Sequence, residues 1–135
     1  MKVLLQQVVI NDPRSAFHGS TKDILIADGK LLRIDDAIEM ADVRTINADG
    51  AVVSPGWVDP FSHFNDPGTE HKETLESGAA AAAAGGFTTV FVIPNTKPAI
   101  DTKSSVEYIT AKSIHLPVSV LPLGAVTRNT DGKEL

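Results

Sequence analysis

The stretch AAAAAAGGFTTVFVI, residues 79–93, decides the fold. Alanine has the highest helix propensity of all residues, so residues 79–84 predict the body of an α-helix. The pair Gly85-Gly86 predicts the end of that helix. The apolar, β-rich run at 87–93 then predicts a strand that is covered on both faces. A helix followed at once by a buried strand is typical of a parallel α/β structure.

The same alternation extends to both sides of this stretch. Residues 56–64 predict a buried strand that runs into a loop, and the helix after it begins near Thr74. A second helix is predicted over 103–113, with Asp101-Thr102 as its N-cap, and a third strand over 118–123. A closed (β/α)₈ barrel typically needs about 250 residues. The 135 residues therefore predict the first strands and helices of an incomplete TIM barrel.

Residues 1–53 have a different pattern, in which short β-branched runs alternate with turns. Asp28-Gly29, between two apolar runs, is a two-residue hairpin signal. Five short strands, at 3–5, 8–10, 23–27, 30–34 and 43–47, predict a small antiparallel sheet. We therefore expect two domains, an N-terminal β-sheet domain at 1–53 and the start of the barrel at 54–135.

Composition excludes several classes of function. A net charge of −5 argues against nucleic acid as a partner, because no basic surface could neutralise phosphates. The absence of cysteine excludes a disulfide framework and a thiolate zinc site. Gln6-Gln7 interrupt the first apolar run, which argues against a secretory signal, and no run approaches the ~20 apolar residues of a membrane span. The expectation is a cytoplasmic protein without membrane contact.

Active groups of a TIM barrel lie at the C-terminal ends of its strands. This rule selects residues 59–68, 94–101 and 124–131. Two histidines at i and i+2 of a strand can bind one metal ion, but the residue two before His63 is Phe61. Spacing alone favours a hydrogen-bonded structural role for His63 over a metal ligand. For Asn95, substrate binding and turn formation between two prolines stay equally open.

The order and spacing of several motifs resemble dihydroorotase, a cyclic amide hydrolase of the amidohydrolase superfamily. The resemblance covers nearly the whole chain, and the hairpin at 26–30 is similar to the small β-domain that precedes the barrel there, where it is part of a composite β-sandwich. Allantoinases and dihydropyrimidinases share the outline but match these segments less well. The motifs are PGWVD at 55–59, HFNDPG at 63–68, EHKE at 70–73, AAAAGGFTT at 81–89 and PNTKP at 94–98.

The resemblance implies a zinc-dependent enzyme that interconverts carbamoyl aspartate and dihydroorotate in pyrimidine biosynthesis. It assigns His63 to the second metal-binding histidine and Asn95 to a substrate-binding asparagine. Phe61 stands where the first metal histidine is expected. Asn65 stands where an arginine that binds the substrate carboxylate is expected.

These two departures leave two interpretations open. One is a working dihydroorotase with a depleted metal site, for which dihydroorotate is the substrate. The other, which the losses favour, is a non-catalytic dihydroorotase-like protein that assembles with aspartate transcarbamoylase. In either case we assign no catalytic residue and expect no activity from residues 1–135 alone. Zinc is the cofactor that the family implies, although the losses predict poor binding. The strand edges of an unclosed barrel predict an oligomer.

Overall fold

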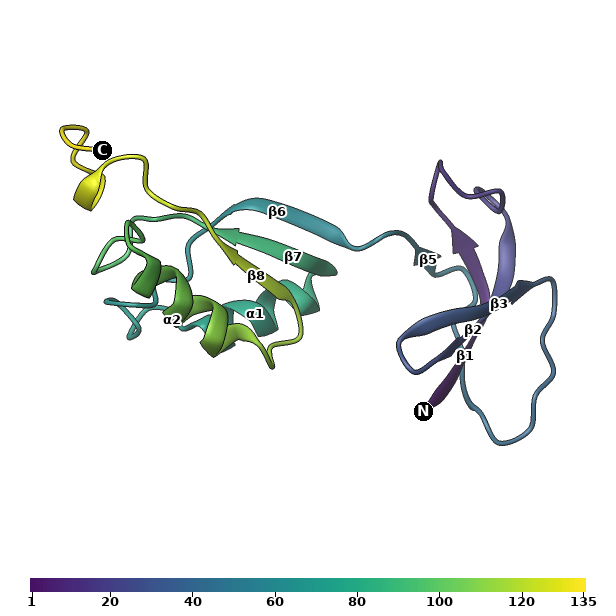
Figure 1. Ribbon diagram of the computed structural model, residues 1–135. Coiled ribbons are helices and arrows are strands. Elements are labelled where there is room, and N and C mark those ends of the chain that lie inside the picture. The colour runs from purple at the N-terminus through teal and green to yellow at the C-terminus, as the bar shows by residue number, and fades with distance from the viewer. The chain divides into compact units, whose positions relative to one another are not determined.

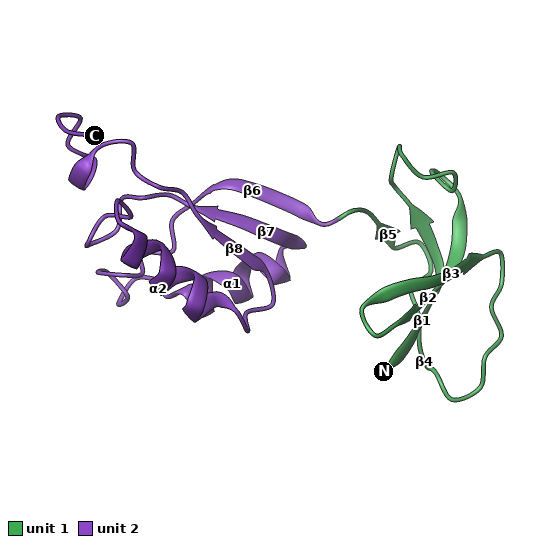
Figure 2. Ribbon diagram, viewed as in Figure 1, with its two compact units in different colours: residues 1–55 green, residues 56–135 purple.

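The computed structural model describes residues 1–135 in two compact units, Met1–Pro55 and Gly56–Leu135 (Figure 2). Each unit has hydrophobic cores of its own. Leu4 and Val8 belong to the cores of unit 1, whereas Leu75 and Ile109 belong to the core of unit 2. Neither helix of the structure has the length and apolar character that crossing a membrane requires.

Unit 1 is a five-stranded sheet built around its first strand (Figure 1). The strands β1, β2 and β3 form an antiparallel meander. β4 and β5 also pair with β1, but they run parallel to it. The predicted antiparallel sheet is therefore wrong for β4, because the chain crosses over from β3 to β4 and does not form a hairpin there. β5, which was not predicted as a strand, continues along the same edge of β1. The strands are β1 (Lys2–Ile10), β2 (Thr21–Ala27), β3 (Lys30–Asp35), β4 (Arg44–Asn47) and β5 (Val52–Val53).

Two local features shape this sheet. The predicted hairpin at Asp28-Gly29 is confirmed, since it joins β2 to β3 with φ of 50° and 74° at its two residues, as a type I′ turn requires. The two short strands predicted within residues 3–10 are instead one strand with a bulge, where the register shifts between Leu5 and Val8. Gln7 has a φ of 57° at this bulge.

Unit 2 is a three-stranded parallel sheet in the order β6-β7-β8. Two helices connect successive strands and lie on the same face of the sheet (Figure 1). The predicted alternation of strand and helix is confirmed, and the barrel is not closed in this chain. The elements are β6 (Trp57–Ser62), α1 (Leu75–Ala84), β7 (Phe87–Val92), α2 (Lys103–Ser113), β8 (Ser119–Pro122) and the short 3₁₀ helix η1 (Arg128–Thr130).

Helix α1 is bounded by local signals. Thr74 is its N-cap and forms a capping box with Ser77, because each side chain accepts from the other residue's backbone N–H. At the other end, Gly86 has a φ of 83°, which glycine adopts without a steric penalty. Within the helix, a Cβ at Gly78 would lie 2.6 Å from Cδ1 of Phe64. The absence of a side chain at Gly78 thus admits the Phe64 ring to the core.

The face of the sheet opposite the helices is open. Val90 and Val92 are buried on the helical side, whereas Phe91 is only half-buried. β6 is more exposed still, with Trp57 at 61% and Phe61 at 68%. The predictions of a buried strand at 56–64 and of a strand at 87–93 covered on both faces are therefore wrong for this chain, because α1 and α2 cover one face only.

Candidate functional site

The predicted site residues lie where the chain leaves β6 and β7. The two parallel strands end side by side, since Ser62 pairs with Val92 and the Ile93 N–H donates to the Ser62 carbonyl at 3.1 Å. His63 begins the loop after β6, and Asn95 lies in the loop after β7. The side chains of His63 and Asn95 meet, with 3.2 Å between Asn95 Nδ2 and His63 Nδ1.

This contact sets the hydrogen-bonding state of the imidazole. An amide nitrogen can only donate, so Nδ1 of His63 accepts the hydrogen bond. In the neutral ring the proton then lies on Nε2. In this state Nδ1 accepts a hydrogen bond from Asn95, and Nε2 carries the ring proton. A metal ion could bind Nε2 only by replacing that proton.

Phe61 lies in β6, two residues before His63. Its ring meets the His63 ring edge-to-face, with 6.0 Å between centroids and 75° between planes. A phenyl ring cannot coordinate a metal ion. No group of three or more histidine or carboxylate side chains in residues 1–135 is arranged to hold a metal, whereas protein zinc sites use three or four protein ligands. The residues of this chain do not fit a zinc ion by themselves.

Asn65 is held within its own loop. Its backbone has a φ of 57°, and its carbonyl oxygen accepts from the Thr69 N–H at 2.8 Å. Its side-chain Oδ1 accepts from the Thr69 hydroxyl at 3.3 Å. The structure thus brings His63 and Asn95 together but gives Asn65 a partner four residues later.

Comparison with known proteins identifies the family. A family model described as dihydro-orotase-like matches residues 50–135, which is more than half of the chain.

The chain belongs to the dihydroorotase-like family.

The curated proteins to which this dihydroorotase-like chain is similar include dihydroorotases, as the motifs in its sequence predict. It is 40% identical over 136 residues to a dihydroorotase of Aquifex aeolicus, covering all of this chain and 32% of the relative. It is 42% identical over 137 residues to a dihydroorotase of Caldanaerobacter subterraneus subsp. tengcongensis, again covering all of this chain but 31% of the relative. The chain therefore spans about a third of the length of these relatives. The predicted membership of this family is confirmed.

Solved structures place the fold among cyclic amide hydrolases. The L-hydantoinase (dihydropyrimidinase) from Arthrobacter aurescens matches with a TM-score of 0.79 and 27% identity, over 94% of this chain and 28% of that one. A dihydroorotase crystal structure matches with a TM-score of 0.65 over 95% of this chain and 32% of that one, and its 24% identity supports the fold alone. The dihydroorotase-like chain thus has the mixed α/β fold of the corresponding part of these enzymes.

Near His63, the dihydroorotase-like chain has a carboxylate, that of Asp59, which already accepts hydrogen bonds from its own strand. Asp59 accepts from the Ser62 hydroxyl at 2.7 Å and from the Phe61 N–H at 2.9 Å. These two hydrogen bonds, that from Ser62 foremost, lower the pKa of Asp59 below its ordinary value. Asp59, Ser62 and His63 line a cavity of about 180 Å³ together with Glu73 and small residues of α1. Because Ser62 donates to Asp59, its hydroxyl is not aligned as a nucleophile toward the adjacent histidine.

A buried ionic cluster near the site was not predicted. Asp66, fully buried, accepts hydrogen bonds from Lys112 Nζ at 2.7 Å, the Tyr108 hydroxyl at 2.9 Å and the Leu75 N–H at 3.2 Å. Burial raises the pKa of Asp66, but these hydrogen bonds outweigh it and bring the pKa below its ordinary value. The hydrogen bond to Asp66 raises the pKa of Lys112. The four-residue spacing of Tyr108 and Lys112, which places both on one face of α2, was the only signal in the sequence.

The third predicted segment, 124–131, folds against the loop before α2. The Ala125 N–H donates to the Ile100 carbonyl at 2.7 Å, and the Asn129 N–H donates to the Asp101 carboxylate at 2.8 Å. Asp101 is therefore not the N-cap of α2. That role belongs to Thr102, whose hydroxyl accepts from the Ser105 N–H at 3.3 Å.

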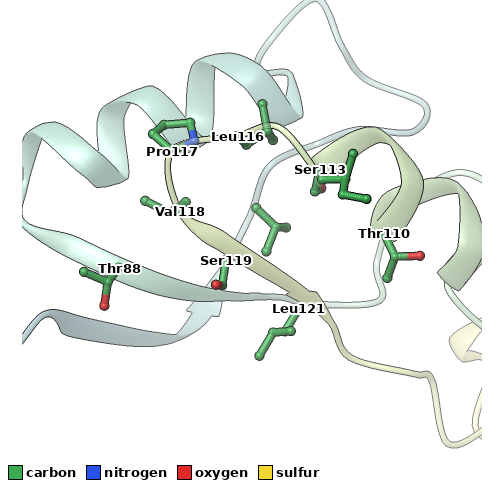
Figure 3. A pocket seen from close by; sticks show the side chains of 10 residues that line it. Thr88, Thr110, Ser113, Leu116, Pro117, Val118, Ser119 and Leu121 are labelled. Atoms are coloured by element: carbon green, nitrogen blue, oxygen red, sulfur yellow. The ribbon is translucent and has the colours of Figure 1, made fainter. Parts of the chain in front are cut away.

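A larger cavity, of about 380 Å³, lies between the end of α2 and the start of β8 (Figure 3). Thr110 and Ser113 of α2 line it, together with residues 116–121. The Ser113 hydroxyl oxygen is buried without a hydrogen-bond partner. None of the predicted site residues lines this cavity.

Proposed function

We propose that this chain contributes a dihydroorotase-like domain to pyrimidine biosynthesis, and that it does not itself hydrolyse dihydroorotate. The observation that carries this proposal is the Phe61 ring packed edge-to-face on His63, at the position where the family resemblance places a second metal-binding imidazole. A site with one imidazole, whose Nδ1 accepts from Asn95, lacks the ligands that zinc catalysis needs.

We further propose that the three parallel strands are the first strands of a (β/α)₈ barrel. Two features support this architecture. Helices α1 and α2 cover one face of the sheet, as helices do on the outside of such a barrel. The likeness to the L-hydantoinase, with a TM-score of 0.79, extends over 94% of the chain. The small β-sheet of unit 1 would then form part of a composite β-sandwich.

The substrate side of the site supports the same proposal. The resemblance places an arginine at position 65, where it would hold a carboxylate through paired, charge-assisted hydrogen bonds. Asn65 offers a neutral amide, and its Oδ1 already accepts from Thr69. Substrate and metal contacts are thus both weakened, while the residues that support the local fold, such as Gly78 beneath Phe64, are present.

A protein with these losses can still act as the structural partner of another enzyme. We propose aspartate transcarbamoylase as its partner, because the losses resemble those of some dihydroorotase-like chains that assemble with that enzyme. Mixing the purified chain with aspartate transcarbamoylase and measuring sedimentation velocity tests this role. A faster-sedimenting complex of fixed stoichiometry is expected, and two independent boundaries would remove this partner from the proposal.

Turnover can contradict the non-catalytic role, although both interpretations predict no hydrolysis by residues 1–135 alone. We expect the chain to hydrolyse dihydroorotate no faster with added zinc than after chelation. Hydrolysis well above the chelated control would establish the second candidate, a working dihydroorotase. That candidate is favoured by the 40% identity to the Aquifex aeolicus dihydroorotase. Hydantoins and dihydropyrimidines belong in the same assay, because two hydantoinase structures match at 27% identity.

Restoring the missing imidazole tests the interpretation of Phe61 directly. Phe61→His would place two imidazoles two residues apart on one strand face, so we expect it to bind zinc measurably more tightly than the unchanged chain. Phe61→Leu is the matched control, because it removes the ring contact without adding a ligand. Isothermal titration with zinc gives the affinities. Equal affinity for all three proteins would show that position 61 is not part of a metal site.

A further inference from the structure

The loop after β6 alternates between exposed site residues and buried anchors. His63 is exposed and Asn65 is half-buried, whereas Phe64 and Asp66 are 6% and 0% exposed. Phe64 enters the hydrophobic core beside Gly78. The loop has no regular secondary structure, and Asn65 holds a φ of 57°. Its conformation therefore depends on what its two anchors contact.

Asp66 is the polar anchor, and it connects the loop to both helices. Its carboxylate accepts from the Leu75 N–H at the start of α1 and from Tyr108 and Lys112 on α2. The Lys112 side chain is 32% exposed and the Asp66 side chain 0% exposed, so the charge-assisted bond between them is shielded from solvent on the Asp66 side. A buried carboxylate that loses its cation is strongly destabilised. Asp66 therefore fixes the loop more firmly than an exposed ion pair would.

The loop that carries Asn95 is docked onto the anchored loop. The Lys97 N–H donates to the Pro67 carbonyl at 3.0 Å, directly after Asp66. At Gly68, with a φ of 109°, a Cβ would lie only 2.3 Å from the Lys97 carbonyl oxygen. The two loops thus touch through backbone atoms. A shift of residues 66–68 would move Lys97 and with it Asn95.

We propose that Asp66, Tyr108 and Lys112 are positioning residues of the candidate site. Their cluster holds the loop with His63 and Asn65 in place and keeps Asn95 against His63 across the docked loops. The inference rests on the proposed site, but it concerns the geometry of that site and not its turnover. Lys112 thereby influences the site although it lies 46 residues from Asp66 in sequence.

Amide hydrogen exchange on the full chain tests this role. In Lys112→Met we expect the Thr69 and Lys97 amides, which donate to Asn65 and Pro67, to exchange about tenfold faster or more, as the loss of a charge-assisted hydrogen bond predicts. The Val90 amide in the central strand should change by less than about twofold. Lys112→Arg should restore slow exchange in the loops, because it keeps the positive charge. The NMR signal of the Asn95 side-chain amide should shift in Lys112→Met and return in Lys112→Arg.

Two further variants complete the test. Lys103→Met is the matched control, because Lys103 lies on the same helix, is 88% exposed and pairs only with Glu107. It should leave all these amides unchanged. Tyr108→Phe removes the hydrogen bonds that the Tyr108 hydroxyl makes with Asp66 and Lys112 and keeps the ion pair. It should give a smaller acceleration in the same loops, and it serves as the test if Lys112→Met fails to fold.

Two results would overturn the inference. One is unchanged exchange at Thr69 and Lys97 in a folded Lys112→Met protein. The other is an equal acceleration at Val90, which would make the cluster a general contributor to stability. Dihydroorotate turnover by the unchanged chain would refute the proposed function and leave these exchange results intact, so the two failures are distinguishable.

Discussion

Asp23 shows how one buried carboxylate can fix an irregular strand. It is 2% exposed, and it accepts from the Gln7 N–H at 3.0 Å, from Gln7 Nε2 at 3.3 Å and from the Ile38 N–H at 2.9 Å. The Gln7 and Ile38 amides have no strand partner at these positions, so the carboxylate replaces the missing ladder bonds. The bulge of β1 and the connection between β3 and β4 are thereby held by the same side chain.

This arrangement predicts a pH dependence of stability. Burial raises the pKa of Asp23, but the hydrogen bonds from Ile38 and Gln7 outweigh it, and the folded-state pKa lies below the ordinary 3.8. The stabilisation is therefore complete above the unfolded-state pKa and is lost as the pH falls through the folded-state pKa. Urea unfolding between about pH 7 and about pH 2 should show this loss in the unchanged protein and a smaller one in Asp23→Asn.

Asp28→Asn is the control for this experiment. The Asp28 side chain is 86% exposed and contacts the N-terminal amine. Its replacement should leave the pH profile close to that of the unchanged protein. A profile for Asp23→Asn that matches the unchanged protein would mean that other carboxylates govern the acid unfolding.

At the scale of single elements, the packing of α1 on the loop after β6 depends on one missing side chain. Gly78→Ala raises helix propensity by about 1 kcal/mol. The added Cβ would lie 2.6 Å from the Phe64 ring, and overpacking of this kind typically costs about 1–3 kcal/mol. We expect the cost of the clash to exceed the gain in helix propensity. The free energy of unfolding, measured by denaturant titration, should therefore fall.

Gly124→Ala provides the comparison for Gly78→Ala. A Cβ at Gly124 meets no atom within 4 Å, and the residue has no positive φ. Stability should change little there. If Gly78→Ala is as stable as the unchanged protein, the Phe64 ring can move aside, and Phe64 does not anchor the loop as described.

The elements differ in how far the sequence could predict them. The starts of α1 and α2 and the end of α1 were predictable because their signals are local, namely the Thr74 and Thr102 caps and the Gly85-Gly86 stop. The parallel pairing of β4 with β1 was not, because it depends on where the connection after β3 returns. Strand burial failed for a similar reason. The apolar composition of 87–93 suits a strand with two covered faces, but this chain supplies helices for one.

The candidate site likewise has one part that follows from the sequence and one part that does not. The sequence analysis placed His63 and Asn95 at strand ends without predicting a contact between them. Their meeting follows from parallel strands that end together. The Asp66 cluster depends on the rotation of α2 about its axis, which brings Tyr108 and Lys112 toward a residue more than 40 positions earlier. No pattern within a short window encodes that contact.

At the scale of the whole molecule, two units with separate cores predict two unfolding transitions. Leu4, 2% exposed, belongs to a core of unit 1, and Leu75, 0% exposed, belongs to the core of unit 2. Replacing a buried leucine with alanine typically costs about 2–5 kcal/mol. Leu75→Ala should therefore destabilise unit 2 and leave unit 1 largely unchanged, and Leu4→Ala should do the reverse.

The one tryptophan of the chain makes this measurable. Trp57 lies in unit 2, so its fluorescence follows that unit, whereas far-ultraviolet circular dichroism follows both. Leu75→Ala should lower the fluorescence midpoint, and Leu4→Ala should lower only a component of the dichroism. A single shared midpoint that moves equally in both variants would show that the units unfold as one.

The hydrogen bond between Asn95 and His63 also determines which chemical groups the imidazole ring can bind. With Nδ1 occupied, the edge of the imidazole that carries Nε2 presents a proton outward. A carbonyl or anionic oxygen at this position can accept a hydrogen bond from Nε2, whereas a metal cation is repelled by the positive partial charge of the proton. The Nε2 edge of His63 would therefore select bound groups by the sign of their charge.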